Sequence, residues 1–257
     1  MPRDTFDEAA ELYDRARPGY PAALVGELVS RSGLSSTGRV LEVGTGTGQL
    51  TVPLAGLGCW ITAVELVPAL AAVARRNLRP FPRAHVDVCA FERWDLPQDP
   101  FDLVVSATAF HWIDPVVRVA KAAAALRPDG MLALVTTHHV AGGSGDLFAQ
   151  AQRCYERRDP ATSAGLLVGR GRGNFDTREA GRSSEFGPVE VHRYAQEITY
   201  STSAYLDLPL TYSGHRALEA SAREGLLSCI GDLTDRRHGG SVTKRYLHEL
   251  ITARRTA

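Results

Sequence analysis

The chain has 257 residues, of which 44% are hydrophobic and 23% are charged, and its formal net charge at pH 7 is zero. A chain of this length and hydrophobic content can bury one large core. The balanced charge gives no overall field that would attract nucleic acid or an anionic membrane, so composition favours a small-molecule partner.

The N-terminal segment MPRDTFDEAAELYDRARPGYP is charged and lacks the apolar region of a signal peptide. No apolar run approaches the ~20 residues that span a bilayer, so we predict a cytoplasmic protein without a membrane partner. The cysteines are widely spaced and show neither a CxxC motif nor Cys/His ligand spacing, so we expect buried free thiols and no metal site. They are Cys59, Cys89, Cys154 and Cys229.

Strand and helix patterns alternate over the first ~140 residues. A short amphipathic helix is expected from Pro21 in PAALVGELVS, followed by the strand RVLEV and by a loop and helix in GTGQLTVPLAGLG. Strands that alternate with helices predict a parallel sheet wound on both faces, because parallel strands need right-handed crossovers. The remaining elements are the strand WITAVE, the helix VPALAAVARRNL, the strands HVDV and FDLVVSA, the helix PVVRVAKAAAALRP and the strand MLALVTT.

The second part of the chain is less regular. SGDLFAQAQRCYERR has a helical pattern, and residues 159–176 are rich in Gly, Arg and Pro, which predicts a loop. VEVHRYAQEITYS alternates as an antiparallel strand does. VTKRYLHELITARR fits a strand or a helix, and we favour a strand.

A loop with three glycines at alternate positions follows the first strand, in Glu42-Val43-Gly44-Thr45-Gly46-Thr47-Gly48. Glycine permits positive φ and lets a ligand approach the backbone closely. In a parallel sheet the ligand crevice lies at the carboxyl ends of the strands, and Glu65 ends the second strand about 20 residues further on, where such folds place a ribose-binding carboxylate. The pattern predicts a nucleotide-type cofactor, and a tight structural turn is the alternative.

The spacing separates this loop from other nucleotide loops. In a dinucleotide fingerprint that begins at Gly44, the third glycine would fall on Gln49, and no GK[ST] of a phosphate loop follows. An oxidoreductase that uses NAD remains as an alternative. Stabilisation of the protein by NAD in a thermal-shift assay would support it.

Four segments together resemble class I S-adenosylmethionine-dependent methyltransferases that act on small molecules: YDRARPGYP, VLEVGTGTGQLT, TAVELVPALAAVARRNL and FDLVVSATAFHWIDP. The resemblance covers about the first 140 residues, weakens after them, and returns in YLDLPLTYSGHRAL and HGGSVTKRYLHEL. It implies an α/β fold with a doubly wound, mostly parallel seven-stranded sheet. A cap would come from the N-terminal helix and from an insertion before the last two strands. The implied organisation is a single domain, 1–257, with a helical lid (1–35), a cofactor-binding core (36–140) and an acceptor cap with the C-terminal strands (141–257).

The resemblance implies S-adenosylmethionine as the cofactor and S-adenosylhomocysteine as its product. The glycine loop would line the methionine and ribose portions, Glu65 would hold the ribose hydroxyls, and Leu66 would pack on adenine. Where the family often has Asp at the adenine edge, this chain has the residues 89–92, so the backbone of Phe91 or the side chain of Glu92 would substitute. The cofactor-binding set implied is Tyr13, Arg17, Tyr20, Glu42, Gly44, Thr45, Gly46, Gly48, Glu65, Leu66, Ala90, Phe91, Glu92, Thr108 and Trp112.

The N-terminal members of this set match a family segment that folds over the cofactor. There Arg17 could pair with the methionine carboxylate, while Tyr13 and Tyr20 flank it. The alternative is that all three are exposed helix and turn residues.

Methyl transfer is an in-line displacement that depends mainly on holding the acceptor near attack geometry, and a general base is optional. His111, after the fourth strand, is the first candidate base, although a packing or orienting role for the His111-Trp112 pair is the alternative. His138 and His139 follow the fifth strand, and only one of them can face a pocket if the strand continues. The alternative is an exposed pair in a loop.

Aromatic side chains of the predicted cap could line an acceptor pocket or form its core. They are Tyr155, Tyr205, Tyr212 and His215.

The sequence therefore predicts methyl transfer to an O, N or C atom of a small planar or apolar acceptor. A non-catalytic module that binds the same cofactor is a second alternative. The segment GLLVGRGRGNFDTREAGR is locally basic, so a nucleic acid is a further possible acceptor. No Asn-Pro-Pro-Tyr motif follows the fourth strand, so a nucleic-acid partner is not favoured. The acceptor and the oligomeric state are not readable from the sequence.

Overall fold

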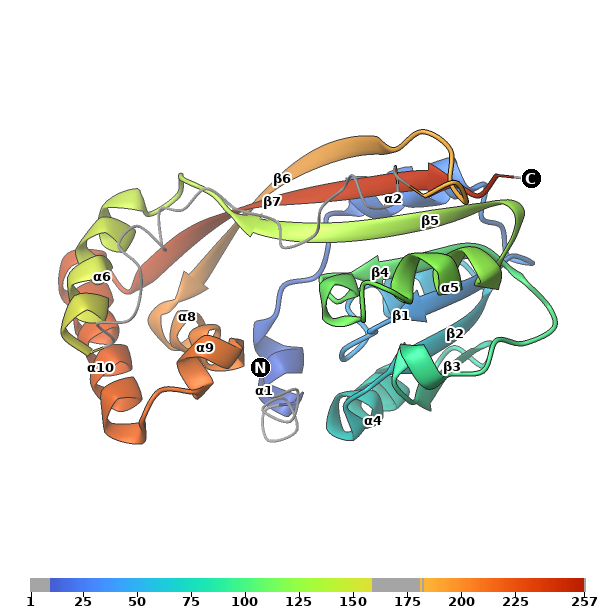
Figure 1. Ribbon diagram of the computed structural model, residues 1–257. Coiled ribbons are helices and arrows are strands. Elements are labelled where there is room, and N and C mark those ends of the chain that lie inside the picture. The colour runs from blue at the N-terminus through green and yellow to red at the C-terminus, as the bar shows by residue number, and fades with distance from the viewer. Residues whose placement is uncertain (1–9, 159–180, 182, 257) are drawn as a thin grey trace. The chain divides into compact units, whose positions relative to one another are not determined.

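The computed structural model describes residues 10–158, 181 and 183–256. Its strands form a seven-stranded sheet in the order β3-β2-β1-β4-β5-β7-β6, mostly parallel with one antiparallel hairpin (Figure 1). This confirms the predicted doubly wound fold. The strands are β1 (Arg39–Val43), β2 (Trp60–Glu65), β3 (Ala84–Val88), β4 (Phe101–Ala107), β5 (Leu126–His139), β6 (Glu190–Ser201) and β7 (Ser241–Arg254).

The predicted helices are present where they fall on described residues, and the loop predicted at 159–176 lies outside those residues. The α-helices are α1 (Ala10–Ala16), α2 (Ala22–Ser32), α3 (Thr51–Ala55), α4 (Pro68–Asn77), α5 (Arg118–Ala125), α6 (Gly145–Arg158), α8 (Thr202–Asp207), α9 (Ser213–Arg216) and α10 (Ala220–Arg237). Short 3₁₀ turns are η2 (Phe91–Arg93), η3 (Phe110–Trp112) and η4 (Pro209–Thr211).

The chain forms two compact units, each assembled from three segments. Unit 1 contains residues 1–17, 138–172 and 195–247, and unit 2 contains residues 18–137, 173–194 and 248–257. Three of the five boundaries fall within β5, β6 and β7, so each of these strands supplies residues to both units. The lid, core and cap boundaries that the sequence suggests stay a prediction.

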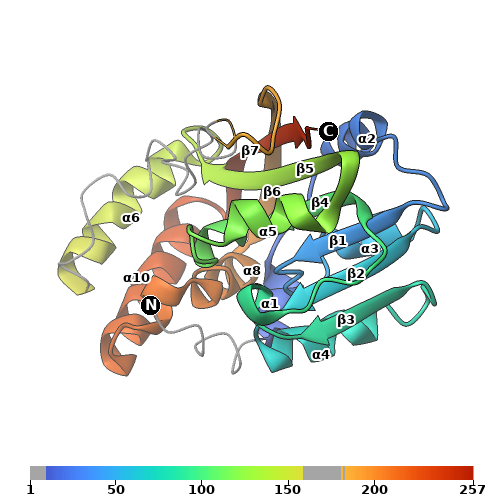
Figure 2. The same cartoon turned by 45° about the vertical axis from the view of Figure 1, so that its right-hand side comes forward.

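Unit 2 has a hydrophobic core on each face of its sheet. Along β1 the side chains alternate, so Val40 joins a cluster that includes residues of α2, α3 and α4, whereas Leu41 joins a cluster that includes residues of α5. The two clusters place α2, α3 and α4 on one face and α5 on the other, an arrangement that can be followed in Figures 1 and 2. Burial on both faces explains why these strands are continuous apolar runs.

The winding direction reverses at β1, which pairs in parallel with β2 on one side and with β4 on the other. Residues that follow the carboxyl ends of β1 and β4 therefore meet at a switch point, the place where open α/β sheets bind ligands. The glycine loop follows β1, and η3 follows β4 after a short connection.

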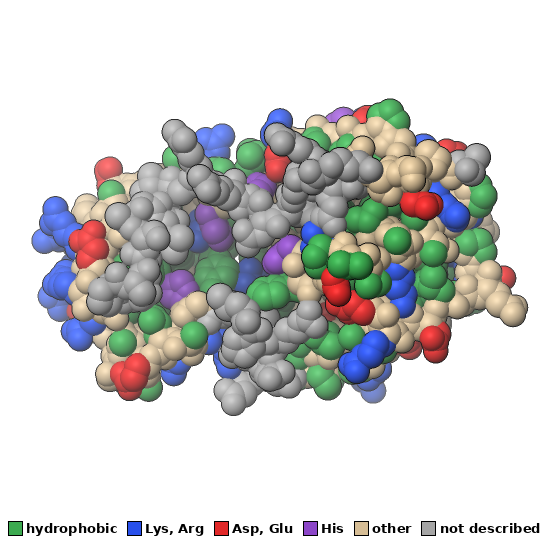
Figure 3. Space-filling view, in the orientation of Figure 1, with side chains coloured by type: hydrophobic (Ala, Val, Ile, Leu, Met, Phe, Trp, Pro, Cys, Tyr) green, Lys and Arg blue, Asp and Glu red, His purple; other side chains and the backbone are tan. Residues whose placement is uncertain are grey.

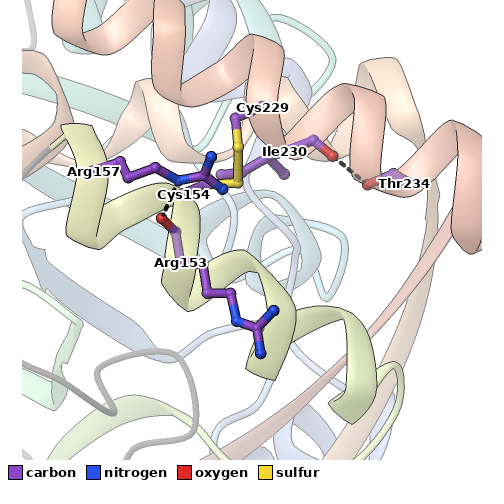
Figure 4. Close-up of a disulfide and its surroundings, with 6 residues drawn as sticks. All are labelled: Arg153, Cys154, Arg157, Cys229, Ile230 and Thr234. Atoms are coloured by element: carbon purple, nitrogen blue, oxygen red, sulfur yellow. Dashed lines mark hydrogen bonds between the residues drawn. A yellow bond between two sulfur atoms is a disulfide. The ribbon is translucent and has the colours of Figure 1, made fainter.

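Unit 1 corrects the expectation of four free thiols. Cys154 on α6 and Cys229 on α10 form a disulfide across 75 residues of sequence (Figure 4), whereas Cys59 and Cys89 are free. Wide spacing along the chain does not prevent the bond, because α6 and α10 pack against each other and the cysteine side chains meet. The disulfide lies in an apolar cluster that also contains Phe148, Leu226 and Ile230.

The surface carries charges of both signs. Figure 3 shows Lys and Arg side chains interspersed with acidic ones, with basic side chains gathered where α6 and α10 lie. Among the described residues, no helix combines the length and apolar character needed to cross a membrane.

Candidate cofactor site

The glycine loop adopts backbone angles that favour glycine. The φ angles of Gly44, Gly46 and Gly48 are +76°, +61° and +99°, a region that side chains with a Cβ rarely occupy. A Cβ on Gly44 would also lie 2.3 Å from the Cβ of Ala109, which follows β4. The loop thus needs glycine both for its conformation and for its close approach to the neighbouring strand.

Glu65 ties this loop to the end of β2. One carboxylate oxygen, Oε2, accepts a hydrogen bond of 2.9 Å from the backbone nitrogen of Gly46, and Oε1 accepts one of 2.9 Å from that of Val67. The residue is 6% exposed, and burial raises the pKa of its carboxyl, while the backbone hydrogen bonds oppose that rise. Each oxygen retains a further lone pair, so the carboxylate can still accept two hydroxyl donors.

Glu42, on β1, is a second carboxyl at this edge, and it is 1% exposed. Burial raises its pKa to about 8, a hydrogen bond with Thr51 opposes the rise, and the nearby Glu65 adds to it. Its Oε2 is buried and has no hydrogen-bond partner among the described residues. An unpartnered acidic oxygen in such a place is an expected contact for a positively charged group.

The connection after β4 is strained. Thr108 has a φ of +54°, which is unusual for a residue with a branched Cβ, and its backbone nitrogen donates to Val135 O at 2.8 Å. Such conformations cost of order 1–3 kcal/mol and cluster at functional sites. The strain lies next to Ala109, which packs on Gly44.

The residues expected around adenine follow β2 and β3. Leu66 is half-buried, whereas Ala90 and Phe91 are buried, and Phe91 packs in the core cluster on the α5 side. Glu92 accepts a hydrogen bond of 3.1 Å from the backbone nitrogen of Asp114. The Phe91 ring therefore serves the core, and its backbone is the part that remains suited to an adenine contact.

His111 and Trp112 lie in η3, and their ring centres are 5.0 Å apart. Burial lowers the pKa of His111, with a further contribution from Arg118, so the imidazole is neutral at pH 7 and able to accept a proton. Arg118 is itself buried and donates to the carbonyl of Phe110 at 3.2 Å, which holds the turn that carries His111.

The histidine pair at the end of the fifth strand contradicts the alternative of an exposed loop, because the strand continues through both residues. His138 and His139 lie within β5, which continues through them, and neither is exposed. The polar sequence TTHH resembles a loop, but pairing of its backbone keeps it in the sheet. His138 is 7% exposed, while the Nε2 of His139 and the Tyr212 hydroxyl share a hydrogen bond of 3.3 Å.

The N-terminal residues of the expected set divide between the units. In unit 2, Tyr20 packs on the first core cluster, with its ring 5.7 Å from that of His248. In unit 1, the guanidinium of Arg17 lies 5.0 Å from the ring centre of Tyr13 and 4.4 Å from that of Tyr212. These residues are thus packed residues rather than free surface groups, and their contact with a cofactor stays a prediction.

Sequence reasoning missed two residues that hold the glycine loop. Thr51, at the start of α3, forms hydrogen bonds with Glu42 and Thr45, and Asn77, at the end of α4, donates to the carbonyl of Thr47 at 2.9 Å. For Thr51 the available signal was a polar residue at the start of the apolar helix α3. Within the described ranges, no group of three or more His, Cys, Asp or Glu residues could hold a metal ion.

Comparison with known proteins gives a matching family model for part of the chain and structures of similar fold. Residues 40–130 match the family model of a methyltransferase domain. An uncharacterized methyltransferase of Mycobacterium tuberculosis is 34% identical over 131 residues, which cover 51% of this chain and 51% of that protein. The chain thus spans about half the length of the curated relatives it matches.

Solved structures resemble this one over nearly all of its length. The cyclase SpnF has a TM-score of 0.57 at 16% identity, with 100% of this chain and 97% of that chain covered. A phosphoethanolamine N-methyltransferase of Haemonchus contortus, in complex with phosphomonomethylethanolamine and S-adenosylhomocysteine, has a TM-score of 0.55 at 16% identity, with 99% and 60% covered. These likenesses establish the Rossmann-like fold of class I methyltransferase structures.

Proposed function

We propose that this chain, whose residues 40–130 match the family model of a methyltransferase domain, transfers a methyl group from S-adenosylmethionine to an O, N or C atom of a small planar or apolar acceptor. The observation that carries the proposal is the pair of buried carboxyls, Glu42 and Glu65, beside a glycine loop at the switch point of the sheet. Family and fold support methyl transfer as the reaction type.

The chemistry of the site fits this cofactor. Glu65 would accept from the two ribose hydroxyls with the lone pairs that Gly46 and Val67 leave free. The unpartnered oxygen of Glu42 would accept from the ammonium of the methionine portion, which would also return the carboxyl to its ionised form. The glycine loop, which lacks Cβ atoms, would let the methionine chain pass close to the backbone.

The bound cofactor supplies an electrophilic methyl group on a sulfonium. The protein has to hold the acceptor atom in line with that methyl group, exclude water and, for a hydroxyl acceptor, receive its proton. In unit 2, His111 suits the role of receiving the acceptor's proton, because its lowered pKa keeps the imidazole neutral at pH 7. We assign His138 no proton transfer in this proposal, although it remains a candidate base from the sequence.

A binding experiment tests the cofactor. S-adenosylhomocysteine should raise the melting temperature of the protein, by an amount equivalent to about 2.7 kcal/mol at 100 times its Kd, whereas NAD should leave it unchanged. Stabilisation by NAD alone would support an oxidoreductase and contradict the proposal.

A labelling experiment tests the reaction. The protein is supplied with methyl-tritiated S-adenosylmethionine and a small-molecule extract, and label should enter the small-molecule fraction. Heat-denatured protein serves as the control for background transfer. Cofactor binding without any transfer of label would instead support a non-catalytic cofactor-binding module.

A further inference from the structure

Unit 1 buries a lysine that has no anionic partner among the described residues. Lys244, on β7, is 8% exposed, and its side chain makes no hydrogen bond or ion pair among the residues that the structure describes. Its Nζ lies between 5.8 and 6.0 Å from the centres of three tyrosine rings. These are the rings of Tyr205, Tyr212 and Tyr246.

Two further basic groups meet the same aromatic cluster. Arg17, which directly follows α1, stacks on Tyr212 at 4.4 Å and donates to the carbonyl of Thr211 at 3.2 Å, while its Nε is buried without an acceptor among the described residues. His139, from β5, contacts the rings of Tyr212 and Tyr246, and its Nδ1 is also buried without a partner in the described part of the chain. All of these residues belong to unit 1.

The cluster contains buried basic groups and no negative charge among its described residues. Burial, followed by the charge of Arg17, lowers the pKa of Lys244 to about 7, and burial, followed by Lys244 and Arg17, lowers that of His139 to about 3. Each of the three rings lies 5.8–6.0 Å from Nζ, at the outer limit of a cation–ring contact, so together they offset only part of the several kcal/mol lost when an ammonium is buried. A bound anion would supply the missing charge.

We propose that Lys244 and Arg17 form a binding site in unit 1 for a small carboxylate with a planar body. The Lys244 ammonium and the unused Nε–H of Arg17 would donate to the two carboxylate oxygens. The surrounding tyrosine rings would pack against the planar body. Identifying this ligand with the methyl acceptor rests on the proposed function, whereas the binding site itself does not.

The test is calorimetric titration of the full chain without cofactor, with benzoate as the probe. Benzoate should bind saturably, and benzamide, which has a similar shape but no charge, should bind at least about tenfold more weakly. Lys244→Met, which keeps the length of the stem, should weaken benzoate binding by about 10- to 100-fold. Arg245→Met is the matched control, because this exposed neighbour on β7 faces Glu197 at 3.9 Å and should bind benzoate as the wild type does.

Thermal unfolding separates loss of binding from loss of fold. Without ligand, Lys244→Met should melt at or above the wild-type temperature, because an unpaired buried charge is replaced by an apolar group. A lower melting temperature would give Lys244 a structural role and overturn the proposal. It would equally be overturned by absence of saturable benzoate binding, by equal affinities for benzoate and benzamide, or by unchanged binding in Lys244→Met.

Titration with the cofactor product distinguishes the carboxylate site from the cofactor site. S-adenosylhomocysteine should not displace benzoate, and displacement would assign the cluster to the cofactor's own carboxylate instead. Stabilisation by S-adenosylhomocysteine without benzoate binding rejects only the carboxylate site. Benzoate binding without stabilisation by S-adenosylhomocysteine rejects only the proposed cofactor.

Discussion

The carboxylate of Glu65 accepts a hydrogen bond of 2.9 Å from the backbone nitrogen of Gly46, so the end of β2 fixes the loop that follows β1. The side chain proposed to hold the ribose therefore also shapes the loop beneath it. Variants of Glu65 should affect both ligand affinity and local stability.

Glu65→Ala should weaken S-adenosylhomocysteine binding by at least about tenfold, because hydrogen bonds to a charged group contribute about 1.5–3 kcal/mol. Calorimetric titration well below the melting temperature measures the affinity. Asp99→Ala, which removes a carboxylate with a side chain 81% exposed near the amino end of β4, should bind normally. Equal affinities for the two variants would remove Glu65 from the cofactor site.

Glu42→Gln should stabilise the ligand-free protein increasingly as the pH rises from 4.5 to 8. The folded-state pKa of Glu42 is raised to about 8 from 4.5, so the folded state binds the extra proton and the wild type loses stability through this window. Glutamine resembles the protonated acid and does not titrate. The difference in unfolding free energy should be near zero at pH 4 and about 3 kcal/mol at pH 7, measured by urea denaturation at each pH. A difference that does not change with pH would contradict the raised pKa.

Gly44→Ala should destabilise the protein by several kcal/mol. The φ of +76° and the 2.3 Å separation between the new Cβ and that of Ala109 both oppose the substitution. Gly26→Ala is the control, because a Cβ at this position in α2 meets nothing within 4 Å and should stabilise the helix by up to about 1 kcal/mol. Thermal melts of the two variants should therefore shift in opposite directions.

Replacing both Cys154 and Cys229 with alanine should lower the unfolding free energy by about 4 kcal/mol, from the chain entropy of a loop closed over 75 residues. Dithiothreitol should destabilise the wild type and leave this double variant unchanged. Cys89→Ser is the control, because Cys89 is a free thiol and its replacement should leave the destabilisation by dithiothreitol unchanged.

His111→Phe distinguishes proton transfer from packing. As a general base for a hydroxyl acceptor, His111 should contribute about 10²–10⁴ to kcat, and the variant should keep its affinity for S-adenosylhomocysteine. Single-turnover methyl transfer gives the rate. Wild-type turnover would reject the base, and a parallel loss of cofactor affinity would indicate that His111 orients the site.

Periodicity predicted the central parallel strands well because β1, β2 and β4 are buried over most of their length on both faces. Strands β2 and β4 cover the predicted segments WITAVE and FDLVVSA. The end of β5 was harder, since the predicted strand MLALVTT ended at Thr137, whereas the strand continues through His138 and His139.

Contacts between distant segments could not be predicted. The disulfide depends on the packing of α6 on α10, which residue spacing does not encode. Burial of Lys244 could have been predicted, because the alternation in β7 puts it on the same face as Val242 and Tyr246. A lysine is unusual on such a buried face. The assembly of each unit from three segments has no local pattern at all.

That assembly has a consequence for biosynthesis. Unit 1 takes its last residues from β7 up to Leu247, and unit 2 takes the rest of the same strand from His248 onward. During translation, neither unit can complete its core until β7 has left the ribosome. Both units therefore become protease-resistant late and nearly together, and a chain that stops before residue 241 leaves two unfinished cores rather than one finished domain and one missing domain.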